Sequence, residues 1–211
     1  MSGFVLSASA GFTAGEMDLL HQVNNIHTAP LDAVALGIDW LFSPAVGVLL
    51  VLLAAGSVLL VTGRADSAIR FLLVVMIPTF GAAVIKLLVH RARPDIPSLP
   101  HILLLEPGGL SYPSGHTNFA ASFLLGIILV MAGHRWRAFM VGAGAVVVLG
   151  TAASRVYLGV HYPSDVVASI VYSIAAVALV NAAWTLLMAH WSERRSVFHA
   201  GPVHGGVWDA R

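Results

Sequence analysis

Five long stretches without a charged side chain limit what this chain can fold into more than any other feature of its sequence. A helix needs about 20 mostly apolar residues to cross a hydrocarbon core about 30 Å thick. The stretches approach or exceed that length, so we expect each to form a transmembrane helix. The second can lengthen through Lys86–Val89, because a lysine stem extends along apolar surface towards the lipid headgroups. The five stretches are Ala45–Thr62, Phe71–Ile85, Thr117–Gly133, Ala138–Ser154 and Val166–Ala189.

The amino-acid composition supports a membrane protein. Hydrophobic residues make up 58% of the 211 positions and charged residues 10%, with a mean hydropathy of +0.86. Soluble domains carry about 25% charged residues, so this chain has too few charges to cover a soluble globule and too much apolar surface to stay disordered. The absence of cysteine excludes disulfides, thiolate metal sites and cysteine nucleophiles. A formal net charge of +1 offers no electrostatic basis for binding nucleic acid.

The first 43 residues differ from the rest, because acidic side chains interrupt their apolar stretches. Apolar residues at helical spacing around Asp18 predict an amphipathic helix lying at the membrane interface. Pro30–Ser43 is too short to cross the bilayer, and a tilted sixth span is the alternative. We therefore expect an all-α integral membrane bundle of five to six transmembrane helices. It divides into an N-terminal interfacial amphipathic segment (1–43), a membrane-embedded core (44–191) and a flexible cytoplasmic tail (192–211).

Arginine residues in the short connections predict the orientation in the membrane. With five spans, the three arginine-rich segments share one face, which the positive-inside rule makes cytoplasmic. The opposite face then carries the acidic N-terminal segment, the loop His90–Thr117 and the connection Arg155–Asp165. We expect that face to lie on the extracytoplasmic side of the membrane. The arginine-rich segments are Gly63–Arg70, His134–Arg137 and His190–Arg195.

Three short motifs lie on the opposite face, each at the end of an expected span. The first runs from Lys86 to Pro94, the second from Pro113 to His116 and the third from Ser154 to Asp165. They contain the basic residues Lys86, Arg93 and Arg155, close to the membrane boundary. A charge at such depth costs about 2.5–3.5 kcal/mol on insertion scales, so three together need a compensating anion. A phosphate group fits, because guanidinium groups bind it through paired hydrogen bonds and an ammonium group binds it as a point charge.

The second motif, Pro113-Ser114-Gly115-His116, has the features of a helix start. The first N–H groups of a helix lack internal acceptors and lie at the positive end of its dipole. Gly115 lets the backbone approach an oxyanion without a Cβ in the way. The Ser114 hydroxyl can donate to the same oxygen or act only as the N-cap.

Two histidines and an aspartate supply groups that can carry out chemistry on a phosphate. One of His116 and His161 can attack phosphorus while the other protonates the departing oxygen, an aid typically worth about 10²–10⁴ in rate. An attacking imidazole must be neutral, and a carboxylate on its other nitrogen fixes the required tautomer. Asp165, four residues after His161, suits this role. Because arginine and lysine already neutralise phosphate oxygens, we expect no metal and no other cofactor.

In this order the motifs Lys-x6-Arg-Pro, Pro-Ser-Gly-His and Ser-Arg-x5-His-x3-Asp resemble the three signatures of the type-2 phosphatidic acid phosphatase superfamily. Members of that family include bacterial membrane lipid phosphatases and, distantly, vanadium-dependent haloperoxidases. Family members often have six spans, whereas the first here is shortened to an interfacial segment. The signature positions are filled by Lys86, Arg93, Pro94, Pro113, Ser114, Gly115, His116, Ser154, Arg155, His161 and Asp165.

The resemblance implies a role for each matching residue. It implies that His161 is the nucleophile that forms a phosphohistidine, that Asp165 orients it and that His116 is the general acid. It also implies that the phosphate is held by a second set of residues. That set is Lys86, Arg93, Ser114, Gly115 and Arg155.

We therefore expect a membrane lipid phosphatase whose lipid substrate enters from the bilayer, with polyprenyl diphosphate as the favoured substrate. Phosphatidic acid or phosphatidylglycerol phosphate is the alternative substrate, and transfer of the phosphate to another lipid is the alternative reaction. A non-catalytic scaffold that binds anionic lipid and a metal-dependent hydrolase are two further alternatives. We assign His90 and Arg91 as interface anchors, and Tyr112, Tyr157 and Tyr162 as aromatic residues at the headgroup level.

Overall fold

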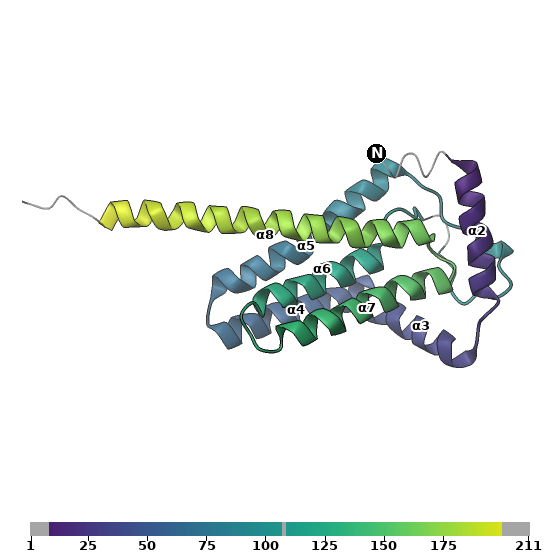
Figure 1. Cartoon of the computed structure of the whole chain (residues 1–211), viewed down its shortest axis with the longest axis horizontal. Helices are drawn as coiled ribbons and strands as arrows, with labels where there is room; N and C mark the ends of the chain where they lie inside the picture. The colour runs from purple at the N-terminus through teal and green to yellow at the C-terminus, as the bar shows by residue number, and fades with distance from the viewer. Residues whose placement is uncertain (1–8, 107–108, 200–211) are drawn as a thin grey trace, which may run out of the picture.

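The computed structural model describes residues 9–106 and 109–199, and within these ranges the protein is built from α-helices and one short 3₁₀-helix (Figure 1). Helix α6 lies at the centre of the bundle, where it packs against α5, α7 and α8, while α4 packs on α5. In order the elements are α2 (Ala10–Asn24), α3 (Ala29–Leu41), α4 (Pro44–Thr62), α5 (Ala65–Val89), η1 (Ile96–Ser98), α6 (Gly115–Val130), α7 (Arg137–Tyr157) and α8 (Pro163–His199).

The expected all-α membrane bundle is confirmed. Helices α4, α5, α7 and α8 are each long and apolar enough to cross a membrane. Helix α6, expected over Thr117–Gly133, has 16 residues and is shorter than these spans. It ends early because the chain turns at Gly133, whose φ of +86° is a left-handed conformation that glycine adopts without strain.

Apolar side chains cover the outside of the bundle, as a lipid environment requires. Leu60 and Val61 are each 86% exposed near the end of α4. Inside, α5 and α6 approach closely at Gly126, where an added Cβ would lie 3.0 Å from a methyl group of Val75 and 3.1 Å from the Phe71 ring. Small residues at such contacts are typical of packing between membrane helices.

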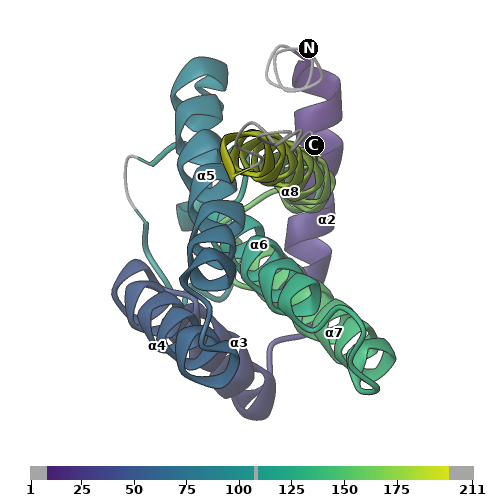
Figure 2. The ribbon, with the colours of Figure 1, turned by 90° about the vertical axis from the view of Figure 1, so that its left-hand side faces the viewer.

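The N-terminal segment forms two helices at one end of the bundle. Helix α2 lies across the direction of α8 in both views (Figures 1 and 2). A helix around Asp18 is thus present, and its placement at a membrane interface stays a prediction. At the other terminus α8 continues without a break past the expected boundary at Ser192 to His199. The remainder of the expected tail, 200–211, lies outside the described residues.

The arginine-rich connections are gathered at the end of the bundle opposite α2. The α4–α5 turn, the α6–α7 turn and the distal part of α8 all lie at that end (Figure 1). The loop between α5 and α6 and the turn between α7 and α8 lie at the α2 end. The fold therefore separates the arginine-rich connections from the three motifs, as the count of spans predicted.

Candidate active site

The start of α6 and the start of α8 are bound together by hydrogen bonds between helices. The Ser169 hydroxyl of α8 donates to the backbone oxygen of Ser114 at 3.0 Å, and the Ser114 amide donates to the backbone oxygen of Asp165 at 3.5 Å. Near the end of α5, Lys86 Nζ donates to the backbone oxygen of Leu110 at 2.9 Å, just before α6 begins. These bonds bring the second motif together with the last residue of the third, and with the lysine of the first.

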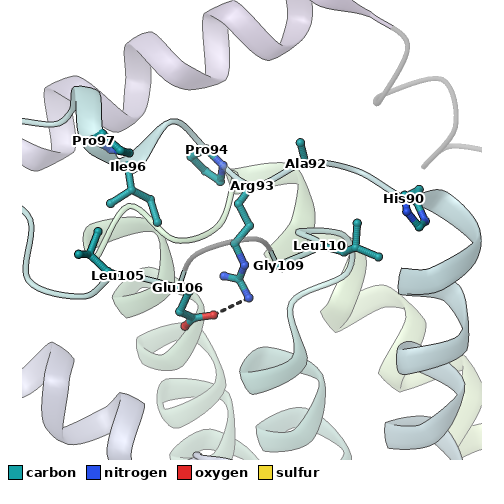
Figure 3. Close-up of a pocket in the computed structure, with 10 residues that line it drawn as sticks. All are labelled: His90, Ala92, Arg93, Pro94, Ile96, Pro97, Leu105, Glu106, Gly109 and Leu110. Carbon is teal, nitrogen blue, oxygen red and sulfur yellow. Dashed lines mark ion pairs between the residues drawn. The ribbon is translucent and has the colours of Figure 1, made fainter.

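Two arginines of different motifs share one carboxylate. Arg93 Nη2 lies 2.5 Å from Glu106 Oε2 (Figure 3), and Arg93 Nη1 donates to the backbone oxygen of Val160 at 2.9 Å. Arg155, fully buried in the last turn of α7, donates through Nη2 to the other oxygen of Glu106. One carboxylate, that of Glu106, therefore bridges the two guanidinium groups, and Arg93 also bonds to Val160, the residue before His161.

A second carboxylate joins Arg155 to His116. Asp39, in the last turn of α3, accepts a hydrogen bond from Arg155 Nη1 with the same oxygen that lies 3.3 Å from His116 Nε2. A single oxyanion thus reaches both the arginine of the third motif and the histidine of the second. A phosphate oxygen at this position would have the same two neighbours.

His161 follows the turn that ends α7 and is buried against Asp165. Gly159, with a φ of +70°, allows that turn, and an added Cβ there would lie 2.2 Å from a methyl group of Leu99. His161 Nδ1 and Asp165 Oδ2 are 3.5 Å apart, which is longer than a good hydrogen bond. Asp165 is held from other sides as well, because Oδ2 accepts from the Ser111 hydroxyl and, at 3.0 Å, from the Tyr162 amide.

The surroundings of His161 keep its imidazole neutral. Burial lowers the pKa of His161 to about 3, and the positive charges of Arg93 and Arg155 act in the same direction, against the opposing effect of Asp165. Glu106 shows the reverse balance. Burial alone would raise the pKa of Glu106, but the Arg155 and Arg93 guanidinium groups outweigh burial and hold this pKa below its usual value. The site therefore combines an unprotonated imidazole with an ionised carboxylate.

Gly115 and His116 open onto a groove in the side of the bundle. A Cβ added at Gly115 would meet nothing within 4 Å. The groove has a volume of about 550 Å³ and is lined mainly by apolar residues of α4, α5 and α6. Its polar end is formed by Lys86, Gly115 and His116. A second cavity, of about 530 Å³, lies on the loop side and is lined by Arg93, Glu106 and neighbouring loop residues (Figure 3).

Arg91 is the residue at which the sequence-based assignment was most clearly wrong. We expected an interface anchor, but its side chain is only 3% exposed. Arg91 Nη1 donates to Asp165 Oδ1 at 2.7 Å, and Nη2 donates to Glu16 of α2 at 2.6 Å. Its guanidinium also lies 4.1 Å from the centre of the Tyr162 ring. The signal that was available is its position two residues before Arg93, in the same loop.

The expectation that three tyrosines lie at the headgroup level is also wrong. Tyr112, Tyr157 and Tyr162 are all buried inside the protein rather than exposed to lipid. Tyr157, for example, donates from its hydroxyl to Asp32 of α3 at 2.6 Å.

The acids Asp39 and Glu106 were not assigned to the site from the sequence, because neither lies in a motif. Among residues 9–106 and 109–199, no group of three or more His, Asp or Glu side chains is arranged to hold a metal ion.

Comparison with proteins of known sequence gives matches over part of the chain. The chain is 37% identical over 102 residues to decaprenylphosphoryl-5-phosphoribose phosphatase of Mycobacterium tuberculosis, which covers 47% of this chain and 51% of that protein. It is 38% identical over 71 residues to phosphatidylglycerophosphatase B of Escherichia coli, covering 34% of this chain and 28% of that protein. The chain thus matches about half the length of the first relative.

Solved structures share the fold. The crystal structure of a transmembrane PAP2-type phosphatidylglycerolphosphate phosphatase from Bacillus subtilis superposes with a TM-score of 0.76 at 22% identity, over 85% of this chain and 89% of that chain. LpxE of Aquifex aeolicus gives a TM-score of 0.60 at 24% identity, over 77% of this chain and 92% of that chain. The family model described as the PAP2 superfamily matches residues 67–190, a segment that contains all three motifs. Because that segment is more than half of the chain, the protein belongs to the PAP2 superfamily.

Proposed function

We propose that this protein is an integral membrane phosphatase that removes the terminal phosphate from a lipid phosphate or diphosphate. The observation that carries the proposal is the site around Arg155, where a neutral, buried His161 and a second imidazole, His116, lie beside converging guanidinium groups. Such a site has a nucleophile, a proton donor and fixed positive charge for the same tetrahedral anion.

In the first step, His161 attacks phosphorus with Nε2 while Nδ1 faces Asp165. A nitrogen–phosphorus bond forms and the bond from phosphorus to the lipid oxygen breaks. His116 gives its proton to that oxygen, so the lipid leaves as a neutral hydroxyl group or, from a diphosphate, as a protonated phosphate. Asp165 stabilises the positive charge that the phosphorylated imidazole acquires.

The positive charges supply most of the stabilisation of this step. The transition state for phosphoryl transfer is loose and spreads charge over three equatorial oxygens. Arg93, Arg155 and Lys86 neutralise those oxygens, and the Ser114 hydroxyl and the Gly115 amide donate hydrogen bonds to them. The complete burial of Arg155 supports this role, because a fixed charge in a site of low dielectric constant acts more strongly than the same charge in water.

In the second step, water replaces the histidine. His116, now unprotonated, takes a proton from the attacking water, the nitrogen–phosphorus bond breaks and inorganic phosphate leaves. The proton taken from water then resides on His116, where the phosphate anion of the next substrate stabilises it. If another lipid hydroxyl attacks in place of water, the same steps make the protein a phosphotransferase.

The groove along α4, α5 and α6 supports a lipid substrate. Its apolar walls suit an acyl or prenyl tail, and its polar end lies at Lys86, Gly115 and His116, where the headgroup would meet the site. The names of the relatives point the same way, since one acts on a decaprenyl-linked phosphoribose and the other on a phosphatidylglycerophosphate. We infer that the site faces the outside of the cytoplasmic membrane of a bacterium, with the C-terminus in the cytoplasm.

The test is release of inorganic phosphate by the purified protein in detergent, without an added acceptor lipid. The panel consists of polyprenyl diphosphate, phosphatidic acid and phosphatidylglycerol phosphate, and His161→Ala is the control. We expect release from at least one lipid, and a fall of at least about 10²-fold in His161→Ala with unchanged elution in gel filtration. Full activity of His161→Ala would refute the mechanism. Release only when an acceptor lipid is added would indicate a phosphotransferase, and loss of activity in chelator would indicate a metal-dependent enzyme.

A further inference from the structure

Asp39, an acid that belongs to none of the three motifs, lies against the histidine of the second motif. Its Oδ1 is 3.3 Å from His116 Nε2 and also accepts a hydrogen bond from Arg155 Nη1. Asp39 lies in the last turn of α3, and the final backbone oxygens of a helix lack partners within it and carry partial negative charge. The end of α3 therefore places negative charge beside the His116 ring.

Charged groups from four elements act on His116 or lie beside it. The two cations oppose a positive charge on the ring, and the two carboxylates favour it. Of these two carboxylates, Asp39 is the one that contacts the ring. Helix α4 carries no charged side chain, and Asp165, at the start of α8, faces His161 and Arg91 instead. The four groups are Asp39 of α3, Lys86 of α5, Glu106 of the loop before α6 and Arg155 of α7.

The site therefore holds two imidazole–carboxylate pairs that differ in their contact with water. The side chains of His161 and Asp165 are 1% and 0% exposed, whereas those of His116 and Asp39 are 18% and 20% exposed. Burial disfavours a charged imidazole in the first pair, and partial contact with water permits one in the second. Two groups with surroundings as different as these suit the opposite roles of nucleophile and acid in one reaction.

From these contacts we propose that Asp39 is a positioning residue that keeps a proton on His116, so that His116 acts as the general acid of the first step. The proposal rests on the phosphatase activity proposed above. His116 donates Nε2–H to Asp39 and gives the proton of Nδ1 to the lipid oxygen as its bond to phosphorus breaks. Asp39 stays in place during this step, because Arg155 has another donor for the phosphate. That donor is its buried Nε, which has no hydrogen-bond partner among the described residues.

The experiment compares two substrates that differ in their need for an acid. Phosphatidic acid releases an alcohol, whose oxygen must gain a proton, whereas para-nitrophenyl phosphate releases an anion that is stable without one. We measure kcat/KM, because it reports the steps up to the loss of the leaving group. Asp39→Asn keeps an oxygen for Arg155 but has no charge. In this variant we expect kcat/KM to fall by at least about tenfold for phosphatidic acid and by less than about threefold for the nitrophenyl ester.

The matched control is Asp66→Asn, which removes the same charge from a largely exposed pair at the other end of the bundle. It should change neither value. A second readout is the pH dependence of kcat/KM for the lipid of the panel above that is cleaved fastest. Activity falls on the alkaline side as the acid loses its proton. Because the proton is lost at lower pH without the carboxylate, we expect this alkaline limb to move down by about one pH unit or more in Asp39→Asn. Asp39→Glu, which keeps the charge, should move the limb less.

Each outcome separates the role of Asp39 from the phosphatase activity. Release of phosphate from none of the lipids refutes the phosphatase function itself. With an active protein, equal falls of kcat/KM for the two substrates, or an alkaline limb that stays in place in Asp39→Asn, refute the role of Asp39 and leave the phosphatase function intact. If the nitrophenyl ester is not cleaved, the alkaline limb decides. If Asp39→Asn does not fold, the same results are expected of Asp39→Ser, which also offers an uncharged oxygen to Arg155.

Discussion

At the scale of single residues, burial changes the chemistry of His161, which is only 1% exposed. Burial, helped by Arg93 and Arg155, lowers its pKa to about 3, whereas an unfolded chain has histidines with pKa about 6.5. Between these values the unfolded state binds a proton that the folded state does not, so the free energy of unfolding rises with pH. Above about pH 6.5 neither state binds the proton and this contribution is constant.

We therefore predict that the protein loses stability as the pH falls from about 6.5 towards 3, with His161 contributing up to about 1.4 kcal/mol per pH unit. The measurement is thermal unfolding in detergent between pH 7.5 and 4.5 for the unaltered protein and for His161→Gln, whose side chain does not titrate. The variant should show a smaller fall of Tm with acidification. Parallel curves for the two proteins would mean that His161 is not held neutral in the fold.

At the scale of elements, Arg91 connects three parts of the chain that are far apart in the sequence. Its guanidinium contacts Glu16 of α2 and Asp165 of α8, and Glu16 in turn accepts hydrogen bonds from the Ser164 amide at 2.7 Å and the Ser164 hydroxyl at 3.0 Å. Helix α2 thus positions the carboxylate that lies against His161. This is why the N-terminal helix matters to a site whose motifs all lie between residues 86 and 165.

Removing the guanidinium should destabilise the protein and reduce its activity. Arg91→Ala leaves two buried carboxylates without their cation, and loss of one partner of a buried ion pair typically costs about 3–5 kcal/mol. We expect a lower Tm and a lower kcat for phosphate release, with Arg91→Lys restoring part of both. Arg64→Ala is the control, since Arg64 and Asp66 form a largely exposed pair at the other end of α5 and its loss should leave Tm nearly unchanged. Equal effects of the two alanine substitutions would contradict the positioning role of Arg91.

At the scale of the whole molecule, the two ends of the bundle differ in charge and in chemistry. The arginine-rich connections lie at one end, and the three motifs with α2 lie at the other (Figure 1). From the positive-inside rule we predict that the arginine-rich end is cytoplasmic. A substrate on the outer leaflet would then reach the groove at Lys86 and His116 from within the bilayer.

The absence of native cysteine allows this orientation to be tested by labelling. Ser98→Cys places a thiol at an exposed position of the loop on the motif side, and Ala65→Cys places one at the exposed start of α5 on the other side. With a membrane-impermeant maleimide, we expect intact cells to label Ser98→Cys and to label Ala65→Cys only after permeabilisation. The opposite pattern would place the site in the cytoplasm.

How much the sequence reveals differs between the site and its surroundings. The placement of Lys86, His116 and His161 at one end of the bundle could be predicted from short motifs, because each motif lies at the end of an apolar stretch whose length identifies it as a helix. Arg91 was misassigned and Asp39 was not assigned to the site, although each bonds to a residue of a motif. Their partners lie 74 and 116 positions away along the chain, a separation that no local spacing encodes.

The sequence by itself determined that the chain is a membrane bundle and that three basic residues and two histidines collect at one end of it. It could do so because the length of an apolar helix and the side on which it ends are local properties of the chain. Only the tertiary structure decided which carboxylate faces which cation: Glu16 on Arg91, Asp39 on Arg155, and Glu106 between two arginines. Those pairings depend on how helices pack across the bundle, where burial forces each charge to find a partner.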